Sequence, residues 1–228
     1  MTSELLSAKG LSAGYGSGPV IRDIDLEIRQ GELVALIGAN GAGKSTTLLA
    51  LAGAVKPSSG QLLWEGSPVD EPLHKRARRG LALVTDDRAL FMRLSVLDNL
   101  LVGRCDVDQA FTIFPELRPL ASRKTGLLSG GEQQMLTLAR AIARRPKVLL
   151  FDELSLGLAP LAVQRLFAAL HDAVQTLGIG VLVVEQHVTQ ILKVATRAYV
   201  MSRGEIVLSG TAQEILARRD EIQSAYIG

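Results

Sequence analysis

The sequence predicts an α/β fold of one domain, with a phosphate-binding loop in its core, an N-terminal antiparallel β subdomain and an inserted helical lobe. Residues 38–45 read Gly-Ala-Asn-Gly-Ala-Gly-Lys-Ser, which fits G-x-x-x-x-G-K-[ST], between an apolar run at 33–37 and a helix-like segment at 47–52. Two further apolar runs, at 148–151 and 181–184, end in polar residues, as strands do at the ligand-binding edge of open α/β sheets.

The helical lobe is expected where the pattern changes to short apolar helices joined by loops. We therefore treat residues 1–228 as one domain, with residues 88–139 as the lobe. Residues 1–87 and 140–228 then form the core, including the β subdomain. With 228 residues, 47% of them hydrophobic, the chain is long enough to bury such a core.

Charge and cysteine content exclude some classes of function. The formal net charge is +2, from 25 basic and 23 acidic residues, which gives no indication of nucleic-acid binding. Cys105 is the single cysteine, so no intrachain disulfide is expected and a reducing compartment fits best. The N-terminus lacks a signal-peptide pattern, and no window of about 18 residues is free of charge. Work at a membrane would therefore require docking on a partner.

The N-terminal part is expected to begin with two short paired strands at 5–9 and 20–28, the second because its apolar residues alternate. Tyr15 lies between two glycines on the loop that joins them, near the phosphate loop. Its ring could stack on adenine, although a loop tyrosine considered alone more often packs half-buried. After the first helix, residues 56–60 predict a turn and 61–65 a strand.

The middle of the chain is expected to form a helix at 71–79 and a short buried strand at 81–84. Asp86 lies in the polar segment that ends this strand, where open α/β sheets contact their ligands. Ser95 and Asp98 form a capping box that opens the first helix of the lobe.

The C-terminal part is expected to contain a turn at 155–160, a helix at 161–175 and a buried strand at 180–187. Residues 197–209 predict a hairpin that turns at Arg203-Gly204, and two short helices follow it.

The phosphate loop supplies the first group of predicted nucleotide-binding residues. Its glycines let backbone N–H groups converge on phosphate oxygens, and the helix N-terminus adds partial positive charge. Lys44 would reach the β- and γ-phosphates, and Ser45 would coordinate Mg²⁺. A glycine-rich turn that only caps a helix is the competing explanation, which the preceding strand disfavours. The predicted residues are Gly38, Asn40, Gly41, Ala42, Gly43, Lys44, Ser45 and Thr46.

A second anion-binding element is predicted near the end of the lobe. Residues 127–134 read Leu-Leu-Ser-Gly-Gly-Glu-Gln-Gln and precede a helix. Two consecutive glycines at a helix N-terminus leave backbone N–H groups accessible to an anion. Ser129, Gly130 and Gly131 are therefore candidate ligand-binding residues.

Asp152 and Glu153 end an apolar strand. One carboxylate could hold Mg²⁺, directly or through water, while the other orients an attacking water. Alternation along a strand would send the two side chains to different sides, which allows different roles. Two acids that only solubilise a strand end are the competing explanation, which the phosphate loop disfavours.

With both anion-binding elements and the acidic strand end in place, the chain resembles the ATP-binding cassette (ABC) ATPases, a family with a P-loop NTPase core, over residues 5–228. Many NTPases share the phosphate loop, but the Leu-Ser-Gly-Gly-Glu-Gln-Gln element ahead of a strand that ends in Asp-Glu is specific to this family. Four segments make the chain similar to the shorter of the two ATPase subunits of branched-chain (hydrophobic) amino acid importers: residues 36–44, 155–160, 184–186 and 224–228.

The resemblance implies ATP and Mg²⁺ as cofactors, and hydrolysis of ATP to ADP and phosphate coupled to transmembrane transport. Two cassettes of this family, identical or paralogous, dimerise head to tail, and each ATP lies between the phosphate loop of one and the second anion-binding element of the other. The implied roles are adenine stacking for Tyr15, γ-phosphate contact in trans for Ser129, Gly130 and Gly131, general base or water positioning for Glu153, and Mg²⁺ association for Asp152.

The resemblance also implies partners and a location. The partners are two transmembrane permease subunits and, indirectly, a periplasmic or lipid-anchored substrate-binding protein, without nucleic acid. The permeases would hold the chain at the cytoplasmic face of the plasma (inner) membrane.

Three positions depart from the common pattern of the family. Thr85-Asp86 stands where Pro-Gln, or Pro-Glu in this subgroup, is usual, and the carboxylate of Asp86, shorter than that of glutamate, would reach Mg²⁺ or the attacking water less well. Leu154 replaces the proline that usually follows Asp-Glu, which removes a constraint on φ. Gln186 occupies the position of the switch histidine, as in the importer subgroup, and His187 is the alternative contact to the γ-phosphate.

Several functions besides amino-acid import stay open on the sequence alone. Within transport, an importer of urea or short amides is the nearest rival. A soluble ABC protein that acts on DNA or ribosomes is disfavoured by the single Leu-Ser-Gly-Gly element and the absence of a long insertion. A phosphate-loop kinase or GTPase would not require that element.

Overall fold

The computed structural model describes residues 3–16, 18–218 and 221–222. Its strands are β1 (Glu4–Gly14), β2 (Pro19–Arg29), β3 (Leu33–Gly38), β4 (Pro57–Trp64), β5 (Ser67–Pro68), β6 (Leu81–Val84), β7 (Val148–Asp152), β8 (Gly180–Glu185), β9 (Arg197–Ser202) and β10 (Glu205–Thr211). Its helices are α1 (Lys44–Ala52), α2 (Leu73–Arg78), α3 (Val96–Val102), α4 (Val107–Ile113), α5 (Gly130–Ile142), α6 (Pro160–Leu177), α7 (Val188–Ile191) and α8 (Ala212–Ala217), with short 3-10 helices η1 (Pro115–Leu120) and η2 (Thr125–Leu127).

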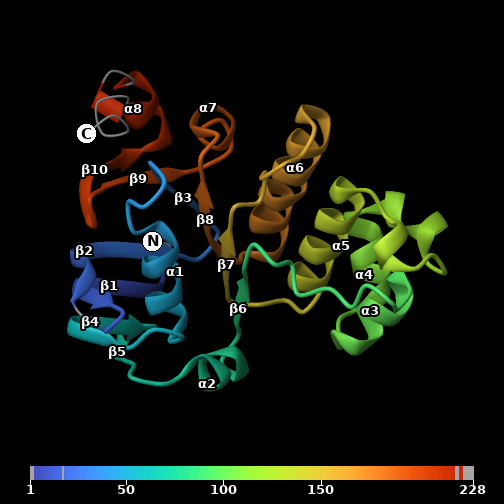
Figure 1. Cartoon of the computed structure of the whole chain (residues 1–228), viewed down its shortest axis with the longest axis horizontal. Coiled ribbons are helices and arrows are strands. Elements are labelled where there is room, and N and C mark those ends of the chain that lie inside the picture. Colours follow the sequence, from blue (N-terminus) through green and yellow to red (C-terminus); the bar gives the residue numbers. More distant parts are fainter. Residues whose placement is uncertain (1–2, 17, 219–220, 223–228) are drawn as a thin grey trace.

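Within the described residues these strands form two sheets. One is antiparallel, in the order β2-β1-β4-β5, and the other follows the order β10-β9-β3-β8-β7-β6. In the second sheet all neighbours are parallel except β9 and β10. Figure 1 shows the antiparallel sheet at one end of the molecule, α3, α4 and α5 at the other, and the parallel strands between them. The predicted α/β core, antiparallel β subdomain and helical lobe are therefore confirmed.

The central strand β3 faces a hydrophobic core on each side. Its Leu33, Ala35 and Ile37 belong to a core that includes buried residues of α5 and α6, whereas Val34 and Leu36 belong to a core with α1 and the antiparallel sheet. Successive side chains of a strand point to opposite faces, so a strand buried on both faces is apolar throughout, as β3 is. Consequently α1 and α5 lie on opposite faces of the parallel sheet.

The topology brings the ends of several strands to one edge of the parallel sheet. Ile37 pairs with Glu185 and Asp152 pairs with Val184 in the parallel ladders. Because parallel strands run in one direction, the loops after β3, β7 and β8 all start at this edge. Polar groups that are far apart in the sequence thus meet there.

The predicted turn at 56–60 is wrong. β4 begins at Pro57, and Pro57 and Ser59 pair with the end of β1, which is longer than the predicted strand at 5–9. Proline is tolerated as the first residue of a strand. A Cβ on Gly60 would lie 2.2 Å from the carbonyl oxygen of Gly10, so the glycine serves close approach of two strands rather than a turn.

Several element boundaries also differ from the predictions. α5 runs to Ile142, past the predicted end of the lobe at 139, and the short helix α7 was not predicted. The hairpin of β9 and β10 turns at Arg203-Gly204 as predicted, and α8 is one of the two expected C-terminal helices. The importer-like segment 224–228 lies outside the described residues. Among the residues that are described, no helix combines the length and apolar character needed to cross a bilayer.

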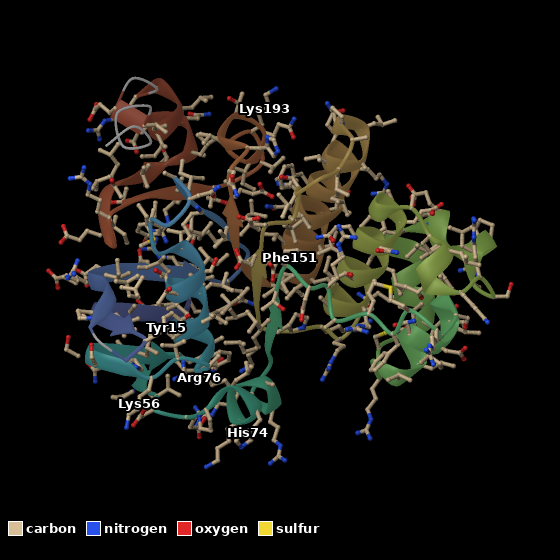
Figure 2. All side chains as sticks on the ribbon, viewed as in Figure 1. Tyr15, Lys56, His74, Arg76, Phe151 and Lys193 are labelled. Atoms are coloured by element: carbon tan, nitrogen blue, oxygen red, sulfur yellow. The ribbon has the colours of Figure 1, made fainter. Side chains whose placement is uncertain are left out.

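Arg76 is buried beneath the C-terminal end of α1 (Figure 2). Its guanidinium donates to the carbonyl oxygens of Leu51 at 2.6 Å, Ala50 at 3.4 Å and Glu71 at 2.6 Å. Carbonyl groups at the end of a helix lack partners within the helix, and Arg76 supplies a donor to the carbonyl oxygen of Leu51, whereas that of Ala50 also accepts from the N–H of Gly53. Burial lowers the pKa of Arg76, which shows the cost of placing a charge there.

Replacing Arg76 with methionine should lower the free energy of unfolding by about 2 kcal/mol, because the buried carbonyl groups lose their donor. The measurement is denaturant unfolding followed by circular dichroism. The neighbouring Lys75 is exposed, and Lys75→Met should change stability by less than about 0.5 kcal/mol. Equal stability of the two variants would contradict the capping role of Arg76.

Candidate functional site

The phosphate loop connects β3 to α1 at the shared edge of the sheet. Gly43 precedes α1 with φ of 102°, and a Cβ there would lie 2.7 Å from the side chain of Ile21 on β2. Glycine is therefore required both by the backbone conformation and by the close approach of β2. Asn40, Gly41 and Ser45 are exposed, so they lie where a ligand can reach them.

The other predicted loop residues are buried. Gly38, Ala42, Gly43 and Thr46 can offer a ligand little besides backbone groups, because their side-chain positions face the protein. The loop thus consists of an exposed rim above a buried base. This is the arrangement that a cradle of backbone N–H groups requires.

Lys44 lies at the base of the loop. It is 5% exposed, and its Nζ donates to the carbonyl oxygens of Gly38 at 2.8 Å and Ala39 at 2.9 Å. Burial lowers the pKa of Lys44, while nearby Glu153, Asp152 and Glu185 oppose that shift. The ammonium group is thus held inside the loop and within electrostatic range of the carboxylates at the edge of the sheet.

Asp152 and Ser45 provide oxygen donors next to the loop. The Ser45 side chain lies close enough to the Asp152 carboxylate to oppose the rise in its pKa, and Asp152 Oδ1 is buried without a hydrogen-bond partner. Burial raises the pKa of Asp152, and the charges of Glu153 and Asp86 raise it further. A divalent cation would favour the ionised form of Asp152 against both burial and the neighbouring negative charges, and it would bind the unpartnered Oδ1. The oxygen donors of Ser45 and Asp152 therefore fit Mg²⁺.

The described residues contain no cluster of three or more His, Cys, Asp or Glu that could hold a metal by itself. Mg²⁺ is commonly held by one or two protein ligands together with substrate phosphates and waters. A site at Ser45 and Asp152 would therefore be completed by a phosphate in the loop. Asp86 lies in an exposed turn after β6, near enough to Asp152 to influence its charge.

Glu153 follows β7 with φ of 51°, in the left-handed region that residues other than glycine rarely adopt. The expectation that strand alternation separates Asp152 from Glu153 is wrong, because the strand ends at Asp152. The backbone N–H of Glu153 donates to the carbonyl oxygen of Val184 at 3.0 Å.

Gln186 reaches Glu153 from the adjacent strand end. Its Nε2 donates to Glu153 Oε1 at 2.5 Å. His187 is exposed at the start of α7, and because β8 ends at Glu185, strand alternation does not decide where His187 points. The structure therefore brings Gln186 to Glu153, and a role for His187 stays a prediction.

Ser129 forms the predicted start of α5. Its hydroxyl accepts from the backbone N–H of Glu132 at 3.3 Å, and its own N–H donates to Glu132 Oε2 at 2.7 Å. This capping box leaves Ser129 and Gly130 exposed, with Gly131 half-buried. The phosphate loop and this second element thus start helices on opposite faces of the sheet.

Tyr15 follows the end of β1 and is 55% exposed (Figure 2). This exposure argues against a half-buried packing role. Ala13 pairs with Ile21, whose side chain lies beside Gly43. Tyr15 therefore follows directly after a strand end that pairs with β2 beside the phosphate loop.

Comparison with known proteins identifies the family. The family model described as ABC transporter matches residues 21–155, more than half of the chain. The high-affinity branched-chain amino acid transport ATP-binding protein BraG of Pseudomonas aeruginosa is 39% identical over 234 residues, covering 98% of this chain and 100% of BraG. The lipopolysaccharide export system ATP-binding protein LptB of Escherichia coli K12 is 35% identical over 238 residues, covering 98% of this chain and 97% of LptB.

A solved structure agrees with these relatives. The structure of cbiO1 from Clostridium perfringens, described as part of the ABC transporter complex cbiONQ, superposes with a TM-score of 0.85 at 26% identity. The match covers 97% of this chain and 94% of cbiO1. The chain therefore belongs to the ABC transporter family, as one of its ATP-hydrolysing subunits.

Proposed function

We propose that this chain is the ATPase subunit of an importer that takes up branched-chain or other hydrophobic amino acids through partner permeases. The observation that carries the proposal is the 39% identity to BraG over 98% of this chain and 100% of BraG. The segments 36–44, 155–160 and 184–186 support it, since they resemble the importer ATPases.

We place two ATP molecules between two cassettes, which are identical or paralogous. The geometry supports this, because the phosphate loop and Ser129 start helices on opposite faces of one sheet. In the proposed assembly Ser129, Gly130 and Gly131 contact the γ-phosphate bound to the partner's loop. Closing the pair around ATP positions the reactants and neutralises phosphate charge, which are the main requirements of phosphoryl transfer.

The catalytic roles follow from the edge of the sheet. Ser45 and Asp152 would hold Mg²⁺, which supplies charge neutralisation at the phosphates when bound. Glu153 would orient the attacking water and accept its proton, and Gln186, which contacts Glu153, would face the γ-phosphate. We further propose that Tyr15 stacks on adenine, that Asp86 reaches toward Mg²⁺ or the attacking water, and that His187 is the alternative contact to the γ-phosphate.

The proposed partners are two permease subunits and, indirectly, a periplasmic or lipid-anchored substrate-binding protein. They would hold the chain at the cytoplasmic face of the plasma (inner) membrane. Loss of the γ-phosphate contacts after hydrolysis would let the two cassettes separate, a two-state change that the permeases could convert into alternating access.

Lipopolysaccharide export is a second candidate function, which no motif in the sequence indicated. It is favoured by the 35% identity to LptB over almost the whole chain. Import of urea or short amides and a soluble role outside transport are less favoured, and the experiment below also tests them.

The deciding experiment uses the complex of this chain with the permeases and binding protein encoded beside it, reconstituted in lipid vesicles. ATP turnover is measured with leucine-loaded binding protein, with urea and with lipopolysaccharide. We expect stimulation only by leucine-loaded binding protein, together with uptake of labelled leucine.

Stimulation by lipopolysaccharide or by urea alone would replace amino-acid import with that function. ATP turnover of the reconstituted complex that none of the three additions changes would contradict all three transport functions and favour the soluble role.

A further inference from the structure

Glu185 is a buried carboxylate that has no role in the proposed mechanism. It is the last residue of β8, lies between β3 and β7, and is 1% exposed. Burial raises the pKa of its carboxyl group. A carboxylate in such a place is costly unless several donors satisfy it, so its partners indicate what it holds in place.

The donors to Glu185 come from two different strand ends. The backbone N–H of Ser155 donates to Oε1 at 2.8 Å, and the Ser155 hydroxyl donates to Oε2 at 2.7 Å. The backbone N–H of Gln186 donates to Oε2 at 3.2 Å. Ser155 is itself buried, at 2% exposure. The carboxylate therefore joins the segment after β7 to the segment after β8.

The two joined segments carry the groups proposed for hydrolysis. Glu153 lies two positions before Ser155, and the Gln186 side chain donates to Glu153. Together with the backbone from Glu153 to Ser155, these hydrogen bonds form a closed circuit through Glu185 and Gln186. A left-handed conformation such as that of Glu153 costs about 1–3 kcal/mol and persists only where its surroundings fix it.

Ser155 also begins the turn that leads to α6. A Cβ on Gly130 would lie 3.6 Å from Leu158 Cδ2 in this turn, so the turn runs beside the second anion-binding element. By holding Ser155, Glu185 thus fixes the start of a turn that lies between Glu153 and the start of α5.

We infer that Glu185 is a positioning residue for ATP hydrolysis: its carboxylate fixes Ser155 and Gln186 so that Gln186 and Glu153 face each other. Glu185 acts through these two neighbours and does not touch the reacting atoms. The inference rests on the proposed role of Glu153, and its test must separate the two ideas.

The first variants are Glu185→Gln and Ser155→Ala in the full chain. Glutamine matches the size of glutamate, but its NH₂ group would face an N–H or hydroxyl donor. We expect Glu185→Gln to lower kcat about 10–100-fold, as misplacement of catalytic groups does, with ATP affinity changed less than about twofold. Ser155→Ala keeps its backbone donor, so its loss should be smaller. The double variant should be little worse than Glu185→Gln, because both changes break one network.

Glu32 provides a matched control. It is a buried carboxylate paired with Arg197, and it precedes β3 at the opposite edge of the same sheet. Glu32→Gln should lower the unfolding midpoint and leave the kcat of the folded protein unchanged. A positioning role is thereby separated from a general effect of neutralising a buried carboxylate.

An unchanged kcat in Glu185→Gln would overturn the inference, as would a fall in ATP affinity as large as the fall in kcat. Glu153→Gln is measured in the same assay. If Glu153→Gln retains turnover, the proposed role of Glu153 is wrong. If Glu153→Gln loses turnover and Glu185→Gln keeps it, only the role of Glu185 is wrong. If Glu185→Gln fails to fold, Ser155→Ala decides, with reduced kcat at unchanged ATP affinity in favour and unchanged kcat against.

Discussion

Glu153→Gln should lower ATP turnover by about 10²–10⁴-fold, the usual contribution of a positioned general base. The amide keeps the size of the carboxylate but cannot accept a proton from water. ATP affinity should stay within about twofold, since the phosphate loop and Lys44 remain intact and phosphate contacts supply the binding. The measurements are steady-state phosphate release and equilibrium binding of a fluorescent ATP analogue.

Wild-type turnover per subunit should also rise with protein concentration, because the proposed site needs Ser129 of a second subunit. The control is Glu205→Gln, an exposed glutamate at the start of β10, which should hydrolyse ATP at the wild-type rate. Turnover in Glu153→Gln equal to that of the control would remove Glu153 from the mechanism.

Lys44→Ala should weaken ATP binding by roughly 10–150-fold, which corresponds to the about 1.5–3 kcal/mol of a hydrogen bond to a charged group. The ammonium is pre-positioned by the carbonyl oxygens of Gly38 and Ala39, so it reaches the phosphates without a large rearrangement. Titration calorimetry with ATP measures the change. The matched control is Lys193→Ala, an exposed lysine after α7, whose removal should leave the affinity unchanged (Figure 2).

The same variant should not unfold more easily. Burial lowers the pKa of Lys44 below its unfolded value, so the charged form is less favourable in the folded protein than in the unfolded chain at neutral pH. Removing the amine relieves that cost but also takes a donor from the carbonyl oxygens of Gly38 and Ala39, so the thermal midpoint should change little. A large fall in the midpoint together with weaker binding would mean that Lys44 supports the fold rather than the ligand.

Local chemistry explains which elements could be predicted. The phosphate loop, the capping box at Ser95 and the turn at Arg203-Gly204 each depend on residues a few positions apart. The segment 56–60 shows the limit: its Pro-Ser-Ser-Gly sequence favours a turn, but pairing with β1 makes it a strand.

At the candidate site, the residue types were predictable but several contacts were not. Glu153 and Gln186 are 33 positions apart, and Ser155 and Glu185 are 30 positions apart. Glu185 was visible as an acid at the end of an apolar run, yet its role depends on the partner strand. Strand alternation could not decide whether Gln186 or His187 faces the γ-phosphate, because β8 ends at Glu185.

By itself, the sequence determined the class of fold and the kind of ligand, because glycines before a helix, apolar strands and acidic strand ends express their chemistry locally. Only the tertiary structure decided which of these groups meet. The parallel pairing of β3, β7 and β8 brings Lys44, Asp152, Glu153 and Gln186 to one edge, while it leaves Ser129 on a helix of the opposite face. The physical reason is that strand order and register arise from burial on both faces of the sheet, which no single segment specifies.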